Sequence, residues 1–570
     1  MIIGFKEILL AGLITASFPV SSFAQNSEVA KIDTKVAPNN WYQLDRASTG
    51  YYGISLDKAY DFLKGKKSKT VIVAVIDSGI DTLQEDLKPI LWVNPGEIPN
   101  NGIDDDHNGY VDDVHGWNFL GGKDGKNVKE DSEEGARLYW KLKNKFGDNI
   151  PDTSQLMGED KKEAITFLKA KAYITKGVDP GEILMLRNML PQLQEGDSII
   201  AKDLGKTEFT GNDLKGYTSS NMMAKRAAAM YLGMADANKN YDISNTDILS
   251  YFKGQVRKAD FAETPPKDFR GEIVKDNYND FNDRYYGNTD LMTGSPMHGT
   301  HCSGIIAAVR NNGKGINGIA DNVRIMMVRA VPDGDEHDKD IALAIRYAVD
   351  NGAQVISMSF GKGFSPEKQW VDDAVKYAES KGVLLVHAAG NDAQNVDSTD
   401  NFPNPDLIKE NEKAPNFLTV GASGDATNGG FTASFSNYGK ESVDVFAPGV
   451  NIYSTLPGGN KYGNASGTSM AAPVVAGVAA LVLEYFPNLS AEQLRYVIMK
   501  SAVPVTEKVI LPGTQSPAPG KEPTMVNLSD ISVSGGELNA YEAVKLASTL
   551  KGERKEVTLP KGQVRKEKRG

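Results

Sequence analysis

The segment Gly-Thr-Ser-Met-Ala-Ala-Pro at 467–473 places a serine where it could act as a nucleophile. Small residues flank Ser469, and the apolar run that follows it to Tyr485 is typical of a helix. A serine at a helix N-terminus lies among unpaired backbone N–H groups, which stabilise negative charge on a substrate oxygen. Because such a serine more often caps a helix, nucleophilic chemistry requires support from elsewhere in the chain.

A serine hydroxyl needs a base, and the base needs an orienting group. One of the six histidines, His298, stands among small residues in the segment 297–304. The β-branched run at 70–76 leads directly into Asp77, which predicts a buried parallel strand with the carboxylate at its C-terminal end. That end is where α/β sheets bind ligands. Asp77, His298 and Ser469 are therefore the candidate acid, base and nucleophile.

The motifs Asp77-Ser78-Gly79, His-Gly-Thr-His at 298–301 and the serine segment, in this order, resemble the three signature motifs of the subtilisin-like serine proteases, or subtilases. The resemblance implies that His298 takes the proton of Ser469 while Asp77 holds the imidazole. It also implies that Asn391, at the end of the run 383–391, donates its side-chain amide to an oxyanion together with the backbone N–H of Ser469.

The same resemblance implies which residues bind the substrate. The segment 357–361 would pair with an extended substrate backbone and line its first specificity pocket, together with the small residues before Asn391. The implied substrate-binding residues are Ser359, Phe360, Gly361, Ala389 and Gly390. Pairing of this kind gives affinity with little sequence selectivity. Lys362 follows directly and is interpreted as a surface lysine, with a bias toward acidic substrates as the alternative.

The remaining nucleophile and base candidates are interpreted as structural. His301 and His387 are predicted to be packed inside the domain. Cys302 is the only cysteine, so no intramolecular disulfide is possible. It is interpreted as a small buried residue next to the catalytic histidine, and a mercurial bound to it is expected to inhibit the enzyme.

An acidic loop follows the first strand. Counted from Asp104, oxygen ligands stand at positions one, three, five and nine of an EF-hand-like loop, with glycine at six and a backbone carbonyl at seven. His115 stands at twelve, where an EF-hand needs a bidentate acid. The pattern predicts a calcium loop without flanking EF-hand helices, with a solvated acidic turn as the alternative. The predicted ligands are Asp104, Asp106, Asn108, Tyr110 and Asp112. A second, weaker candidate lies at 236–247.

Hydrophobic patterns predict an α/β fold, a doubly wound and mainly parallel sheet flanked by helices. The expected strands are 323–331, 354–360, 383–388, 417–422 and 443–446. The expected helices are 340–351, 367–381, 469–485 and 491–501. Together, 70–120 and 286–550 form the expected catalytic domain.

The 221 positions between Asp77 and His298 (298 − 77) exceed what compact subtilases need. Residues 121–285 are predicted to form a mainly α-helical insertion, with helices at 130–145, 160–175, 180–194 and 221–235. Because its ends enter near two members of the triad, it is expected to rise near the active site. It could restrict access as a cap, or it could be a peripheral bundle.

The N-terminus predicts export. Residues 1–24 have the basic start, short apolar segment and small residues before the cut that define a signal peptide. Residues 25–69 are expected to form an N-terminal arm, which is short for an inhibitory pro-domain, and 551–570 a basic tail. The protein would be periplasmic, surface-associated or extracellular, and no later stretch is long and apolar enough to be expected to span a membrane.

The net charge of −11 argues against nucleic acid as a partner. The sequence therefore predicts a secreted serine endopeptidase that acts on proteins or peptides, with structural calcium and no organic cofactor. A catalytically silent binding protein on the same scaffold is the alternative, and a calcium-dependent structural module is a third possibility.

Overall fold

The computed structural model describes residues 37–147, 152–175, 179–205, 209–238, 241, 244–424, 430–515 and 522–554. The predicted signal peptide, residues 25–36 of the predicted arm and residues 555–570 of the predicted tail lie outside these ranges. The chain divides into two compact units. The larger contains Asn39–Leu138 and the chain from Pro266 onward, and the smaller contains Tyr139–Pro265.

A nine-stranded sheet forms the centre of the larger unit, in the order β12-β15-β9-β8-β5-β4-β1-β3-β2. Its pairs are parallel except β12 with β15. The strands are β1 (Val71–Asp77), β2 (Gly116–Asn118), β3 (Val323–Arg329), β4 (Val355–Met358), β5 (Leu384–Ala388), β8 (Phe417–Ser423), β9 (Val445–Pro448), β12 (Val503–Pro504) and β15 (Gly536–Glu537). The sheet confirms the predicted fold class.

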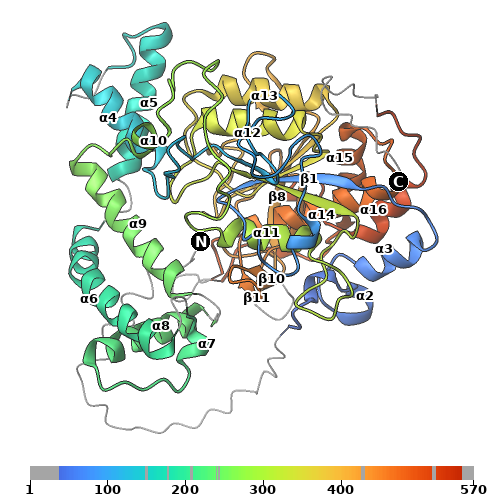
Figure 1. The fold of residues 1–570 in the computed structure, drawn as a ribbon, viewed down its shortest axis with the longest axis horizontal. Coiled ribbons are helices and arrows are strands. Elements are labelled where there is room, and N and C mark those ends of the chain that lie inside the picture. Colours follow the sequence, from blue (N-terminus) through green and yellow to red (C-terminus); the bar gives the residue numbers. More distant parts are fainter. Residues whose placement is uncertain are drawn as a thin grey trace. The chain divides into compact units, whose positions relative to one another are not determined.

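Helices cover both faces of this sheet (Figure 1). On one face lie α12 (Asp338–Asp350) and α13 (Lys368–Ser380), which pack against each other. On the other lie α11 (Met297–Ala307) and α14 (Thr468–Tyr485), which also pack together. Nearly every residue of α14 is buried, because its apolar sequence lies between the sheet and the helices around it.

Shorter elements complete the larger unit. Its other helices are η1 (Trp41–Gln43), α2 (Arg46–Thr49), α3 (Leu56–Leu63), η2 (Lys88–Ile90), α10 (Phe269–Val274), α15 (Ala491–Lys500), η3 (Leu528–Asp530) and α16 (Ala540–Ala547). Three two-stranded sheets pair β6 (Asp406–Leu407) with β7 (Glu412–Lys413), β10 (Ile452–Leu456) with β11 (Lys461–Ala465), and β13 (Val509–Ile510) with β14 (Met525–Val526). Ser490 and Gln493 form a capping box that begins α15.

The smaller unit is built from helices around its own apolar core. They are α5 (Gly158–Thr175), α6 (Pro180–Leu204), α7 (Gly211–Leu214), α8 (Met222–Asn238) and α9 (Asn245–Glu263), while α4 (Glu134–Phe146) begins in the larger unit. Leu186, Ile200, Phe209 and Phe252 are among its buried residues. Asp179 starts α6 by accepting from the backbone N–H of Gly181 at 2.7 Å.

The predicted strands and helices match observed elements, with ends that differ by a few residues. Several features were not predicted. Strands β2, β12 and β15 and helices α7, α9 and α10 are additional elements, α6 runs to Leu204, and the smaller unit spans fewer residues than the predicted insertion 121–285. Residues 121–138 and 266–285 belong to the larger unit because they pack on its sheet and on α12.

Candidate active site

Three strand ends meet at one edge of the sheet. In the parallel register Ile76 faces Met358, and Met358 faces His387. The residues that follow, Asp77 and Ser359, and the chain leaving β5 toward Asn391, therefore come together at the carboxyl edge.

Asp77 and His298 are in direct contact. Helix α11 places His298 in its first turn, and His298 Nδ1 lies 2.8 Å from Asp77 Oδ1 and 3.0 Å from Oδ2. The N–H of Ser78 also donates to Asp77 Oδ1. Gly299 permits the approach of the helix, because a Cβ there would lie 2.2 Å from the carbonyl oxygen of Gly79. Burial lowers the pKa of His298, but the Asp77 carboxylate outweighs it, so the pKa is well above its usual value.

Ser469 is the second residue of α14. Among the described residues, its Oγ donates to the carbonyl of Ser359 at 3.1 Å and forms no hydrogen bond with the imidazole. Its own carbonyl accepts from Ser359 Oγ at 2.9 Å and from Cys302 Sγ at 3.3 Å. The same sulfur lies 4.0 Å from His298 Nδ1. The buried thiol thus contacts both the imidazole and the backbone of the serine.

Two N–H donors converge beside Gly467. Asn391 Oδ1 accepts from the backbone N–H of Thr468 at 2.8 Å and from its hydroxyl at 3.0 Å, which orients the carboxamide. A Cβ placed on Gly467 would lie 3.6 Å from Asn391 Nδ2 and 3.5 Å from the backbone nitrogen of Ser469. Donors that converge in this way are suited to binding an oxyanion.

The predicted substrate-binding segments are joined by a residue that sequence analysis missed. Asn401 Nδ2 donates to the carbonyl of Ala389 at 2.9 Å. A Cβ on Gly361 would lie 2.7 Å from Asn401 Oδ1. Asn437 also donates to Ala389 at 2.9 Å, and Gly390 has φ +101°, so this turn requires glycine. Asparagines in loops carry no sequence signal that separates these two from ordinary turn residues.

The other buried polar residues near the site are held in place. His387 Nε2 lies 2.7 Å from the carbonyl of Phe360, and His301 Nε2 lies 3.2 Å from that of Gly463. Burial lowers the pKa of both histidines to about 4, so they are neutral near pH 7. The interpretation of Lys362 as a surface lysine was wrong: only 5% of this residue is exposed and its ammonium is ion-paired.

Comparison with known proteins accords with this geometry. The family model described as the subtilase family matches residues 68–530. The chain belongs to the subtilase family. This subtilase is 44% identical over 216 residues to a thermophilic serine proteinase of Bacillus sp. (strain AK1), which covers 38% of the chain and 48% of that relative. It is 37% identical over 236 residues to thermitase of Thermoactinomyces vulgaris, covering 40% of the chain and 77% of thermitase.

The chain thus spans about half of one relative and about three quarters of the other. Among solved structures, a protease from Pseudoalteromonas arctica is similar over 89% of this subtilase and 97% of that chain, at 20% identity and a TM-score of 0.43. One described helix of the subtilase, α14, is long and apolar enough to cross a membrane, and 89% of it is buried inside the larger unit.

Among the described residues, the predicted acidic ligands Asp104, Asp106 and Asp112 of the subtilase do not form a group whose oxygens all lie within 4.8 Å of one another. Asp104 accepts from the backbone N–H groups of Asn108 and Gly109, and Asp112 from those of Asn101 and Gly102. Backbone N–H groups within the loop therefore orient several of these carboxylates, and their role as calcium ligands stays a prediction.

One predicted ligand, Asp106, lies close to two buried acidic residues. Oxygens of Glu97, Asp106 and Asp113, here called the acidic trio, lie within 4.8 Å of one another. Asn94 donates to Asp106 at 3.0 Å and to Asp113 at 2.7 Å. Burial raises the pKa of Asp113 to about 7 and also raises that of Glu97. Carboxylate oxygens at this spacing fit a hard divalent cation such as calcium. The second candidate loop, 236–247, lies partly outside the described residues.

Proposed function

We propose that this protein is a secreted serine endopeptidase that hydrolyses peptide bonds through Asp77, His298 and Ser469. The observation that carries the proposal is the pairing of Asp77 with His298 at a sheet edge where the N–H groups of Asn391 and Ser469 converge. A silent scaffold has no physical need for a buried carboxylate paired with an imidazole beside an oriented amide. Family membership supports the same chemistry.

Attack requires one movement of the serine side chain. Rotation about χ1 would take Ser469 Oγ from the Ser359 carbonyl to the imidazole, and free-enzyme geometry is often looser than that of the substrate complex. His298 then accepts the hydroxyl proton as Oγ bonds to the peptide carbon, and returns it to the departing amine. Asp77 stabilises the imidazolium. Water then takes the place of the amine and hydrolyses the acyl-enzyme, with His298 acting first as base toward the water and then as acid toward Ser469 Oγ.

Charge on the substrate oxygen would be stabilised by Asn391 and the backbone N–H of Ser469. These groups are oriented before the reaction, so little reorganisation is needed. Asn391→Leu is expected to lower kcat about 10²–10³-fold, as loss of one such donor does in serine proteases. A loss below about three-fold would contradict this role.

Substrate would bind as an extended chain beside Ser359–Gly361 and Ala389–Gly390. This mode supports protein and peptide substrates with broad sequence preference. The insertion would restrict substrate access if it is a cap, and would have no effect on substrate choice if it is a peripheral bundle. Replacement of 139–265 by a short linker, in a variant that still folds, would separate these roles. Unchanged preference between folded and unfolded substrates would exclude the cap.

Export and calcium belong to the same proposal. The N-terminal pattern supports cleavage after residue 24, which N-terminal sequencing of the mature protein tests. Calcium would bind at the acidic loop through the acidic trio, neutralise it and hold the loop against β2, a structural role only. Its binding is tested by calorimetry with the wild-type protein and Asp113→Asn.

A fluorophosphonate probe tests the central claim. Wild-type protein should be labelled on Ser469 and should hydrolyse casein, whereas Ser469→Ala should do neither. Because the pKa of His298 is raised, kcat/KM should rise with pH through a value above 6.5, as the imidazolium loses its proton. A folded, calcium-loaded protein that is neither labelled nor active would favour a binding protein on this scaffold.

A further inference from the structure

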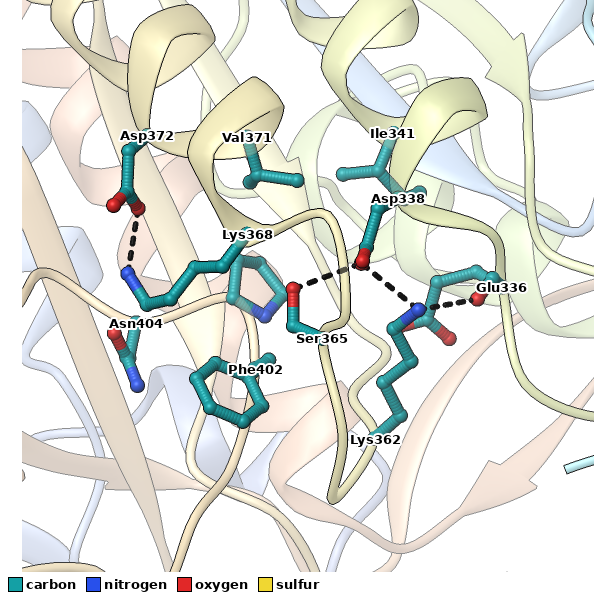
Figure 2. Close-up of a pocket in the computed structure, with 11 residues that line it drawn as sticks. Glu336, Asp338, Ile341, Lys362, Ser365, Lys368, Val371, Asp372, Phe402 and Asn404 are labelled. Atoms are coloured by element: carbon teal, nitrogen blue, oxygen red, sulfur yellow. Dashed lines mark hydrogen bonds and ion pairs between the residues drawn. The ribbon is translucent and has the colours of Figure 1, made fainter. Parts of the chain in front are cut away.

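The lysine that follows the substrate-binding segment is an internal anchor. Lys362 Nζ lies 2.9 Å from Asp338 Oδ1 and 3.0 Å from Glu134 Oε2, and it donates to the carbonyl of Glu336 at 2.8 Å. Figure 2 shows the pairs with Asp338 and Glu336 beside Ser365. Three acceptors around one buried ammonium fix its position, because an unpaired charge at this depth is costly.

The backbone of Lys362 is fixed as well. Its N–H donates to the carbonyl of Phe402 at 3.0 Å, and the N–H of Phe402 donates back at 2.9 Å. This bridge sets Gly361 next to Asn401, the residue that joins the two substrate-binding segments. The position of Lys362 therefore controls the end of Ser359–Gly361.

One acidic partner comes from the chain that leads into the smaller unit. Glu134 begins α4, and its N–H donates to Asp335 Oδ2 at 2.8 Å. Arg137 contacts Glu134 Oε2 at 2.7 Å. Just before the helix, the N–H of Asp131 donates to the carbonyl of Asp333 at 2.9 Å. The entry stem, 129–137, is thus fastened to the segment that precedes α12.

The chain that returns from the smaller unit is also held near the start of α12, by ion pairs. In the exit stem, 270–286, Arg270 lies 2.7 Å from Asp340 and 2.6 Å from Asp276, and Lys339 lies 2.6 Å from Asp276. All four side chains are at most 2% exposed. The two stems therefore meet at the start of α12, the entry stem at the segment 333–335 just before the helix and the exit stem at its first turn.

That turn also holds the loop after Lys362. Asp338 accepts from Ser365 Oγ at 2.9 Å and from the N–H of Glu367 at 2.8 Å. One carboxylate thus joins Lys362, its following loop and the start of α12 (Figure 2). We call Glu134, Asp338, Lys362, Arg270 and Asp340 the stem clamp.

We propose that Lys362 is a positioning residue for the substrate-binding segment Ser359–Gly361, which it couples through the stem clamp to both stems of the insertion. Lys362 does not contact the reacting atoms. It sets the register in which the segment offers its backbone to an extended substrate, so its loss weakens binding of long peptides more than chemistry at Ser469. The inference rests on the proposed peptidase function.

The test compares Lys362→Met with Lys368→Met. Lys368 is a matched control, because it lies in the same cluster and is paired with Asp372 at 2.5 Å but does not adjoin the segment (Figure 2). Two rates are measured at a temperature below the unfolding transition. One is fluorophosphonate labelling of Ser469, which needs no extended substrate chain paired with Ser359–Gly361, and the other is kcat/KM for peptides of increasing length.

Lys362→Met should be labelled within about two-fold of wild type, while kcat/KM for the longest peptide falls about ten-fold, chiefly through KM. Lys368→Met should change neither rate. Glu134→Gln keeps Lys362 and should give a smaller loss of kcat/KM for the longest peptide. It is the test variant if Lys362→Met does not fold. An equal fall for reagent and peptides, or equal behaviour of the two lysine variants, would overturn the inference. Wild type that is neither labelled nor active would instead refute the peptidase function.

Discussion

The stem clamp and the acidic trio are both groups of buried acids in the larger unit, but they differ in what neutralises them. In the stem clamp, lysine and arginine side chains lie within 3.0 Å of the carboxylates. In the acidic trio the carboxylates meet amide groups and the hydroxyl of Tyr347, and no lysine or arginine pairs with them among the described residues.

The difference appears in the ionisation of the two groups. Burial favours the neutral form of Glu134, but Lys362 and Arg137 outweigh it and hold the pKa of Glu134 below its usual range. In the acidic trio burial prevails, and the pKa of Asp113 rises to about 7. The charges of the stem clamp are therefore balanced within the protein, whereas the acidic trio is the group for which we propose a cation supplied from solution.

Removal of one cation from the stem clamp should have the largest effect on stability. Lys362→Met is expected to lower the free energy of unfolding by about 3–5 kcal/mol, because Asp338 is left buried without its countercharge and Glu134 keeps only Arg137. Denaturant unfolding followed by tryptophan fluorescence measures it. Glu134→Gln combined with Lys362→Met should lose less than the sum of the two single variants, and strict additivity would contradict the coupling.

Calcium removal should have the next largest effect, and it should act on the acidic trio alone. With free calcium at a hundred times its dissociation constant, chelation is expected to cost about 2.7 kcal/mol of stability. Thermal unfolding with and without a chelator measures the difference. Asp113→Asn should reduce the dependence on calcium, whereas Lys362→Met should keep it. Equal stability of the wild-type protein with and without calcium would remove the distinction between the two groups.

The pH dependence of the calcium-free protein sharpens the comparison. The folded-state pKa of Asp113 is raised to about 7 from an unfolded value near 4, so its contribution to stability is fully present below pH 4 and is lost as pH rises toward 7. The expected loss is at most about 1.4 kcal/mol per pH unit. Unfolding midpoints from pH 4.5 to 7.5 measure it, with Asp113→Asn as the variant that should lack this component.

A surface ion pair should have the smallest effect. Lys145 contacts Asp160 and Glu163, and all three side chains are at least one third exposed. Because solvent screens such charges, Lys145→Ala should leave the unfolding midpoint unchanged within error. A loss comparable to that of Lys362→Met would mean that burial does not explain the strength of the stem clamp.

Local patterns were sufficient for much of the fold and for the candidate catalytic residues. The run before Asp77 is apolar and β-branched, which predicts β1, and the apolar segment after Ser469 predicts α14. The contact between Asp77 and His298 across 221 positions followed from motif resemblance, since no local pattern encodes it. Asn401 gave no sequence signal because its position depends on a distant β-bridge.

In the acidic loop, the spacing pattern and the folded chain group different residues. Alternating oxygen ligands predicted a cation site near 104–112, and Asp106 does lie in the acidic trio. Glu97 and Asp113 lie outside the counted spacing, and chain folding brings them to Asp106. A spacing rule assumes that one run of alternating positions supplies all the ligands, whereas the site that we propose takes two of its three acids from outside those positions.

The sequence by itself determined the parallel sheet, the helices on its faces and the residues that we propose for acyl transfer, because each depends on periodicity or on a short motif. Only the tertiary structure decided the environment of Lys362, the grouping of the acidic trio and the bounds of the smaller unit. The physical reason is that the ionisation of a buried charge depends on groups brought from distant parts of the chain. Lys362, predicted to lie at the surface, is buried for that reason.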